Sequence, residues 1–186
     1  MQPGDMQPGD RETGNPQPMG RKQAQNKRIV INGLGAALVF VTAMFIHIQV
    51  PIAGIGGMIH MGDVPLFVFA LLYGKKSGAL AGALGLTLFD LLSGWTLWAP
   101  FTLIIAGMVG WVVGSASERN AKGKVSIYAA SIFAALLVTV CGYYVTEGLL
   151  YGNWLTPIGS VPVNALQVAI AAVLAYPLAE RLKRFV

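Results

Sequence analysis

The chain has 186 residues, of which 55% are hydrophobic and only 11% are charged. Because soluble domains carry roughly 25% charged residues, this composition excludes an ordinary soluble domain and indicates a membrane protein with several spans. The net charge of +5 could suggest nucleic-acid binding, but the basic residues are divided among four separate segments. That division excludes a continuous nucleic-acid surface.

The first 28 residues are rich in Gln, Pro, Gly and Asp, and the sequence MQPGD occurs twice in succession. Such a segment cannot bury a hydrophobic core, so we expect residues 1–28 to form a disordered cytoplasmic tail. Residues 29–186 are then expected to form a single membrane domain.

The apolar runs after this tail predict an all-α fold with six transmembrane helices. The first run, Ile29–Val50, has about the 20 residues that a span requires. A glycine-rich outer loop with little tendency to form a regular helix follows, and the second run, Asp63–Tyr73, is short for a span. The remaining predicted helices are Ser77–Leu92, Phe101–Ser115, Val125–Leu149 and Val161–Ala179.

The positive charges predict how these helices cross the membrane, because Lys and Arg concentrate in cytoplasmic segments. With the amino terminus inside, all 13 Lys and Arg residues fall on one side. They lie in the tail, in the turn after the second helix, after the fourth helix and after the sixth. We therefore predict six spans with both termini in the cytoplasm.

Small residues recur every three or four positions on several predicted helices, which lets helix backbones approach closely. Gly74, Gly78 and Gly82 form one such series, and Gly107, Gly110 and Gly114 form another. We expect both series to pack inside the protein. On the first helix, Gly33 and Ala37 form a smaller patch after the basic residues, where a helix of a partner protein is an alternative.

Acidic residues within membrane spans are costly and require a reason. Three of them are predicted at the outer ends of spans, together with three of the four tryptophans. Aromatic walls with a few polar groups are typical of a small-molecule site. The candidate substrate-binding residues are Asp63, Asp90, Trp95, Tyr144, Glu147, Trp154, Asn164 and Gln167, the last two sharing one helix face.

Other roles remain open for these residues. Asp63 could cap a helix, the tryptophans could form an interfacial belt, and Asn164 with Gln167 could tie helices together. His47 and His60 lie near the first outer loop but lack a tight metal-binding spacing, so we expect no metal site. An intramembrane aspartyl protease would need two facing aspartates within the membrane, whereas both candidates are predicted at the outer ends.

The sequence contains no Walker motif, phosphate-binding loop or nucleophile elbow. If this membrane protein transports its small molecule, it needs energy from another chain or from a gradient. A self-sufficient, gradient-driven carrier or channel is therefore one hypothesis, and a subunit of an ATP-driven system is the other.

Two stretches carry a resemblance to a known family: IHMGDVPLFVFALLYGKKSGALAGALGLTLFDLLSGW and WAPFTLIIAGMVGWVVG. A Gly-Asp pair opens a helix, a basic turn follows, and a Gly/Ala-rich helix ends in Asp-x-x-Ser-Gly before an aromatic-x-Pro-Phe-Thr run. This pattern resembles the substrate-binding S components of energy-coupling factor (ECF) transporters, the bacterial vitamin importers. It is most similar to the hydroxymethylpyrimidine and pyridoxine group, with riboflavin and cobalamin members nearby.

The resemblance implies a non-enzymatic protein of the bacterial plasma membrane, with an outward-facing vitamin pocket covered by the first outer loop. The ligand would be a water-soluble vitamin or precursor of the hydroxymethylpyrimidine, pyridoxine, thiamine, riboflavin or cobalamin class. The implied partners are a membrane T component, which Gly33 and Ala37 would contact, and two ATPase subunits. The partners would use ATP, so no cofactor of this chain is expected. Related sequences often have Lys where this chain has Ala106.

Overall fold

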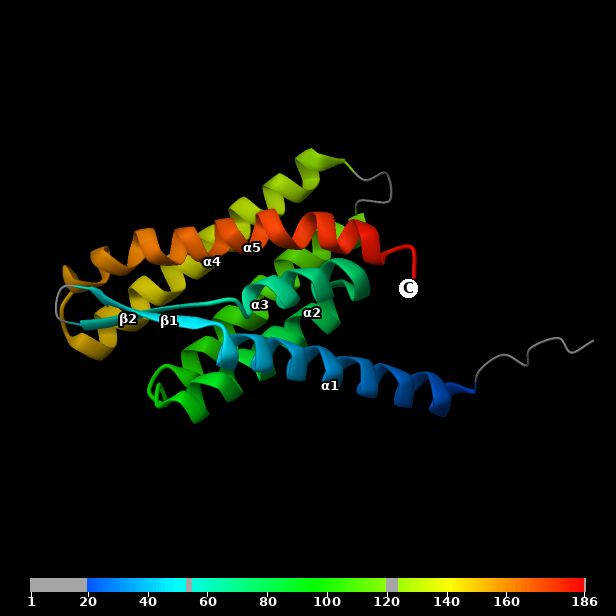
Figure 1. Ribbon diagram of the computed structural model, residues 1–186, viewed down its shortest axis with the longest axis horizontal. Coiled ribbons are helices and arrows are strands. Elements are labelled where there is room, and N and C mark those ends of the chain that lie inside the picture. The colour runs from blue at the N-terminus through cyan, green and yellow to red at the C-terminus, as the bar shows by residue number, and fades with distance from the viewer. Residues whose placement is uncertain (1–19, 53–54, 120–123, 186) are drawn as a thin grey trace, which may run out of the picture.

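The computed structural model describes residues 20–52, 55–119 and 124–185. Its helices lie side by side in one bundle with a β-hairpin at one end (Figure 1). Among the described residues, five helices are long and apolar enough to cross a membrane. The elements are α1 (Arg21–Phe45), β1 (His47–Ile52), β2 (Ile55–His60), α2 (Asp63–Ser93), α3 (Ala99–Arg119), α4 (Val125–Tyr151), the 3₁₀ helix η1 (Thr156–Gly159) and α5 (Ser160–Leu182).

Helix α2 is not one straight rod, because Gly74 breaks it with φ of 82° and ψ of −176°. A Cβ atom placed on Gly78 would lie 2.5 Å from Cβ of Ala70, and one placed on Gly82 would lie 2.7 Å from Leu66 Cδ1. In a straight helix these pairs would be about 12 and 24 Å apart along the axis. The chain therefore reverses at Gly74 and the two arms of α2 pack antiparallel.

This reversal explains why six helices were expected and five are found. The predicted second and third helices are the first and second arms of α2, residues 63–73 and 75–93. A non-helical glycine at the position of the predicted turn joins them into one element. That the short first arm crosses the membrane as a separate span stays a prediction.

The carboxyl end of α3 holds the reversal together. The Ser117 hydroxyl donates a hydrogen bond of 2.6 Å to the Leu71 carbonyl, at the end of the first arm. The Glu118 carboxylate accepts one of 3.0 Å from the Lys75 backbone N–H, at the start of the second arm, and also pairs with the Lys75 ammonium at 3.0 Å. Backbone groups that each arm leaves unpaired at its end are thus satisfied by side chains.

The predicted internal packing of the glycine series is confirmed. A Cβ atom on Gly110 would collide with the backbone of Gly78, and one on Gly114 would lie 2.5 Å from the backbone of Lys75. A Cβ atom on Gly82 would meet the Ala106 carbonyl oxygen at 2.7 Å. Backbone-to-backbone contact between α3 and the second arm of α2 therefore requires glycine at these positions.

Two expectations at the amino-terminal part are wrong. Helix α1 ends at Phe45 and not at Val50, and the fold is not purely helical, because the expected outer loop forms an antiparallel hairpin with His47 opposite His60. Val and Ile in the first strand favour extended structure, and glycines disfavour a helix. Helix α1 also begins at Arg21, within the expected tail, while residues 1–19 lie outside the described part of the chain.

The two ends of the bundle differ in charge. We call one the basic end, because the described Lys and Arg residues lie there, at the start of α1, the reversal of α2, the α3–α4 connection and the end of α5 (Figure 1). The other is the pocket end, with the hairpin, the α2–α3 connection and the α4–α5 connection. Arg11 and Lys122 lie outside the described residues. The orientation of the bundle in the membrane stays a prediction.

A matched pair of Gly-to-Ala variants tests the packing of α2 on α3. Gly110→Ala should destabilise the protein by about 1–3 kcal/mol, because the new methyl group collides with the Gly78 backbone. Gly33→Ala should leave stability unchanged or raise it by up to about 1 kcal/mol, since no heavy atom outside its own helix surrounds that position within 4 Å. Thermal unfolding in detergent measures both, and equal shifts would contradict this packing.

Candidate ligand-binding site

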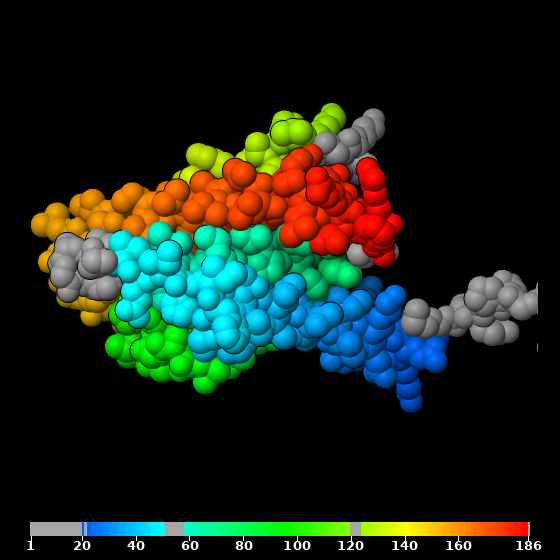
Figure 2. Space-filling model, in the orientation of Figure 1, coloured from blue at the N-terminus to red at the C-terminus, as the bar shows by residue number. Residues whose placement is uncertain are grey.

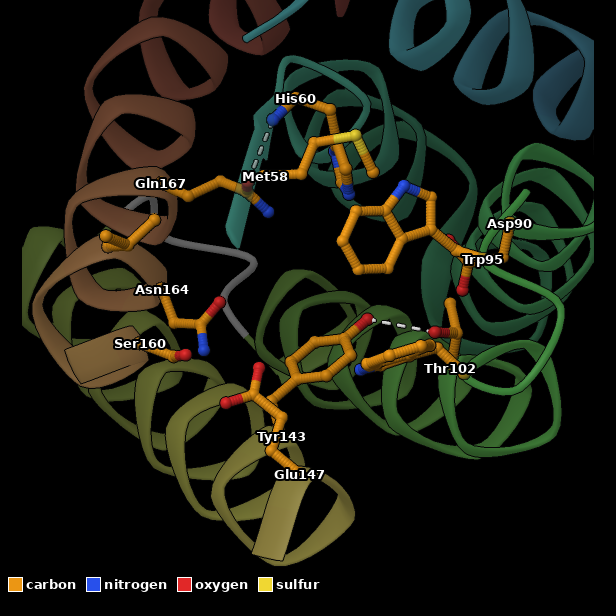
Figure 3. Close-up of a pocket in the computed structure, with 12 residues that line it drawn as sticks. Met58, His60, Asp90, Trp95, Thr102, Tyr143, Glu147, Ser160, Asn164 and Gln167 are labelled. Carbon is orange, nitrogen blue, oxygen red and sulfur yellow. Dashed lines mark hydrogen bonds between the residues drawn. The ribbon is translucent and has the colours of Figure 1, made fainter. Parts of the chain in front are cut away.

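A pocket opens at the pocket end of the bundle, between the hairpin and the ends of α2 to α5 (Figure 3). Its volume is about 60 Å³. A buried water needs about 10–15 Å³, so the pocket has room for about four waters in this conformation. The residues that line it are Met58, His60, Asp90, Trp95, Trp98, Thr102, Tyr143, Glu147, Ser160, Val163, Asn164 and Gln167.

The end of α2 places an acid and an indole side by side. Gly94 adopts φ of 92°, a left-handed conformation that glycine allows, and the N–H of Trp95 donates to the Asp90 carbonyl at 2.9 Å. This pattern is the helix-ending motif in which the chain folds back over the last turn. It brings Trp95 next to Asp90, so both side chains reach the pocket.

Aromatic rings form one wall of the pocket. The rings of Trp95 and Trp98 meet edge to face with their centroids 4.9 Å apart, and Trp98 meets Tyr151 in the same way at 5.9 Å. The hydroxyl groups of Thr102 and Tyr143 form a hydrogen bond of 3.2 Å across α3 and α4. Flat apolar faces with hydroxyl groups at their edges suit an aromatic ligand.

One face of α5 and one face of α4 form the opposite wall. Ser160, Val163, Asn164 and Gln167 follow the i, i+3, i+4, i+7 spacing of a single helical stripe. On α4, Tyr143 and Glu147 are four residues apart and also share a face. Ser160 lies close enough to Glu147 for their side chains to interact.

Gln167 joins three elements at the floor of the pocket. Its side-chain oxygen accepts a hydrogen bond of 2.9 Å from the backbone N–H of His60, at the end of β2. Its side-chain nitrogen donates one of 2.7 Å to the Asp63 carboxylate, at the start of α2. All three residues are buried. One amide thus connects α5 to the hairpin and to α2.

The base of the hairpin rests on Phe89, the residue before Asp90. The rings of His47 and His60, which face each other in the strand register, both contact the Phe89 ring edge to face, with centroids 5.8 and 5.4 Å away. Burial lowers the pKa of His60 below its usual 6.5, against the opposing effect of the Asp63 carboxylate. The imidazole is therefore neutral at pH 7.

Two carboxylates in the pocket have oxygens without a partner. Oδ2 of Asp90 and Oε2 of Glu147 are buried, and neither has a hydrogen-bond partner among the described residues. In Figure 3 the two side chains lie on opposite sides, with Trp95 and Tyr143 between them. None of the described lining residues is Lys or Arg. The pocket is therefore rich in acceptors and short of positive charge.

The structure brings five of the eight predicted site residues to this pocket: Asp90, Trp95, Glu147, Asn164 and Gln167. Asp63 lies beneath them, on a smaller cavity next to the pocket, where Ala106 is also found. Their contact with a substrate stays a prediction.

Tyr144 and Trp154 lie outside the pocket lining, against each other. The Tyr144 hydroxyl donates a hydrogen bond of 2.8 Å to the Trp154 carbonyl, and the Trp154 ring covers Gly148. This pair fastens the α4–α5 connection to α4, and contact of these two residues with a substrate stays a prediction.

Several lining residues were not among the predicted ones: Met58, His60, Trp98, Thr102, Tyr143, Ser160 and Val163. Helical spacing could have found some of them. Tyr143, not Tyr144, shares a face with Glu147, and Ser160 lies on the stripe of Asn164. No pattern in the sequence indicates that Met58 and His60 reach the pocket, because the hairpin carries them there.

No group of three or more His, Cys, Asp or Glu residues in the described part of the chain is arranged to hold a metal ion.

Comparison with known families agrees with this architecture. The family model described as "ECF-type riboflavin transporter, S component" matches residues 23–184, nearly the whole described chain. The chain belongs to the S-component family of ECF-type transporters. It is thus a multi-pass membrane protein of a transport system and not an enzyme, which excludes the aspartyl protease alternative.

Relatives of this S component occur in several organisms. The "Thiamine precursor transporter HmpT" of Lactococcus lactis subsp. cremoris (strain MG1363) is 30% identical over 158 residues, covering 85% of this chain and 89% of that protein. An "Uncharacterized protein in gap 3'region" of Pyrococcus woesei is 35% identical over 115 residues, covering 61% of this chain and 74% of that protein. A "UPF0397 protein" of Streptococcus agalactiae (strain A909) is 30% identical over 98 residues, about half of each chain, 51% and 50%.

The predicted partner patch of this S component lies on the outer side of α1. Gly33 and Ala37 are exposed, whereas Gly35 packs beneath the Phe69 ring. The small residues of α1 thus divide between an inward and an outward face. Contact of Gly33 and Ala37 with a partner stays a prediction.

The pKa of His60 predicts how stability depends on pH. As pH falls from 6.5 toward the lowered pKa of the folded state, the unfolded chain binds a proton at His60 that the folded chain does not, so the free energy of unfolding should fall. Unfolding temperatures measured between pH 7.5 and 5 should show this decrease for the natural chain and less of it for His60→Gln. His47→Gln removes only the weakest contribution to this shift and should change the slope less, and an unchanged slope in His60→Gln would contradict the assignment.

Replacing Gln167 by Met should destabilise the fold by about 2–4 kcal/mol, because it leaves the His60 N–H and the Asp63 carboxylate buried without a partner. Asn164→Leu, one turn away on the same face, removes an amide with no side-chain partner among the described residues and should cost less than about 1 kcal/mol. Chemical or thermal unfolding in detergent compares them. Equal losses would argue against the bridge.

Proposed function

We propose that this chain is the binding subunit of a vitamin importer and that its pocket takes one unphosphorylated aromatic ring with N–H donors, of the thiamine-precursor class. The observation that carries this proposal is the pair of buried, unpartnered oxygens on Asp90 and Glu147. The name of the Lactococcus relative supports the same ligand class.

The two unpartnered carboxylate oxygens favour a ligand with hydrogen-bond donors and disfavour a ligand with negative charge. A buried polar group without a partner costs about 1–3 kcal/mol, which a ligand N–H facing each carboxylate would recover. A phosphorylated ligand would instead bring negative charge next to two acids with no described Lys or Arg in the lining. An amino-substituted pyrimidine presents N–H donors in the plane of its ring and carries no charge at neutral pH.

Shape supports a single ring over a larger one. The cavity volume of about 60 Å³ is small, because Trp95 and Trp98 narrow it from one side and Tyr143 on α4 narrows it from the other. These aromatic faces would stack on the flat ligand while the carboxylates bind its edges. A pocket with room for about four waters must widen even for one substituted ring, and the three fused rings of riboflavin, which the description of the matching family model names, would require it to widen further.

Entry and release would involve the hairpin. Met58 and His60 line the pocket from β2, and the hairpin is held to α5 by the bond between the His60 N–H and Gln167. Breaking this bond would let the hairpin move away and open the pocket. We propose that the hairpin acts as the cover of the pocket on the outer face of the bacterial cell membrane.

The rest of the transport cycle would depend on other chains. Lys and Arg at the basic end favour a cytoplasmic position for that end and for both termini, with six crossings if the short arm of α2 spans. A membrane T component, contacting Gly33 and Ala37, and two ATPase subunits would then supply the ATP-driven step, since the sequence has no ATP-binding motif of its own.

Ligand binding tests the proposal through tryptophan fluorescence. Titration of the purified chain with hydroxymethylpyrimidine should change the emission of Trp95 and Trp98, and riboflavin should bind at least tenfold more weakly. Asp90→Asn should weaken binding about 10- to 100-fold, because a hydrogen bond to a charged group contributes about 1.5–3 kcal/mol. Glu180→Gln, at the basic end, is the control. Tighter binding of riboflavin, or no effect of Asp90→Asn, would contradict the ligand class.

Uptake into vesicles separates the two sources of energy. Vesicles that contain only this chain should not accumulate the ligand, whereas adding the T component, the ATPases and ATP should start uptake. Accumulation by the chain alone under an ion gradient would support the self-sufficient carrier instead.

A further inference from the structure

A second cavity, far from the ligand pocket, lies at the basic end between α1 and the reversal of α2. It has a volume of about 710 Å³, within the 300–1,000 Å³ range of small-molecule sites. The residues that line it are Ala24, Lys27, Arg28, Ile31, Asn32, Tyr73, Lys76, Ser77, Leu80 and Glu118. We propose that this groove binds the headgroup of an anionic, hydroxyl-bearing phospholipid of the phosphatidylglycerol type.

Three positive charges in the groove form no salt bridge within the described part of the chain. Lys27 and Arg28 on α1 and Lys76 on α2 have no acidic partner within ion-pair distance among the described residues. Glu118 is the acid that lines the groove, and Lys75 already occupies it through a salt bridge and a backbone hydrogen bond, each of 3.0 Å. Three exposed cations therefore converge on one cavity, which selects an anion.

The remaining polar groups suit a headgroup that also carries hydroxyls. The side-chain oxygen of Asn32 is buried and has no hydrogen-bond partner among the described residues. It can accept a hydrogen bond from a glycerol hydroxyl, whereas the oxygens of an ionised phosphodiester have no proton to donate. Ser77 also lines the groove, from α2. A phosphodiester with a free hydroxyl next to it satisfies both the cations and this acceptor.

The apolar part of the groove favours a lipid over a soluble phosphate. Ile31, Tyr73 and Leu80 line it next to the cations, and α1 continues from it with exposed Val30 and Leu34. A ligand with a charged head and an acyl chain can occupy both regions at once. A soluble phosphate would leave the apolar wall uncovered.

The position in the fold agrees with a lipid. Figure 2 shows the first turns of α1 standing away from the body of the bundle, so the groove beside them is open from the side. It lies where the apolar part of α1 meets its basic amino-terminal turns, the level at which lipid phosphates are found in a membrane. Basic pockets between helices on the positive side of a membrane protein are typical of anionic lipid sites.

The test measures binding of a fluorescent phosphatidylglycerol to the full-length protein in dodecylmaltoside. The natural chain should bind it at least tenfold more tightly than the matching phosphatidylcholine. Lys27→Gln combined with Lys76→Gln should weaken phosphatidylglycerol binding about 30-fold, at about 1 kcal/mol for each basic residue. The control, Arg181→Gln combined with Arg184→Gln, removes the same charge from the same end and should change binding less than threefold.

Further measurements distinguish a phosphatidylglycerol site from a general anionic-lipid site and from a site for soluble anions. Asn32→Leu should reduce the preference for phosphatidylglycerol over phosphatidylmethanol, a phosphodiester of the same charge with no free hydroxyl, while leaving binding of phosphatidylmethanol unchanged. Equal losses in the two charge-removal variants, or no preference for anionic lipid, would overturn the proposal. Displacement of the lipid by millimolar inorganic phosphate would show a soluble anion site instead. Unchanged unfolding temperature and hydroxymethylpyrimidine binding confirm that the variants fold.

Discussion

A single buried amide connects the parts of this protein that form the ligand pocket. Gln167 accepts from the His60 N–H and donates to the Asp63 carboxylate, so α5, the hairpin and the start of α2 meet at one side chain. In a low-dielectric interior each of these groups would be costly if left alone. The bridge satisfies Asp63 inside the protein, whereas Oδ2 of Asp90 has no hydrogen-bond partner among the described residues. One acid is thereby used for structure and the other stays available.

The close contact of α3 with both arms of α2 gives this bridge a rigid frame. Glycines bring the two backbones together, and Ser117 with Glu118 secures the reversal at the opposite end of the bundle. Asp63 starts the first arm and Asp90 lies near the end of the second, so the antiparallel fold of α2 returns both acids to the same end. A chain that is reversed once at Gly74 thus separates a basic end from an acidic pocket end.

Periodicity and charge in the sequence predicted most of this architecture. The helices, the internal glycine faces and the turn near Gly74 depend on local spacing, which a sequence displays directly. The grouping of Asp90, Glu147 and Asn164 follows from their positions near the helix ends opposite the basic segments. The sequence did not predict the hairpin, because its strands are stabilised by pairing between segments and by packing on Phe89. The hydrogen bond between Tyr144 and Trp154 and the entry of His60 into the pocket depend on tertiary packing, which no local pattern reveals.

The central claim is that one amino-substituted aromatic ring lies between Asp90 and Glu147 and donates hydrogen bonds to both carboxylates. The most direct measurement is a high-resolution structure of the full chain with hydroxymethylpyrimidine bound. The account predicts ligand density in the pocket, with ring nitrogens or the amino group within hydrogen-bond distance of both carboxylates and the ring against Trp95 or Tyr143. Density at another place, or a ligand that contacts neither carboxylate, would contradict it.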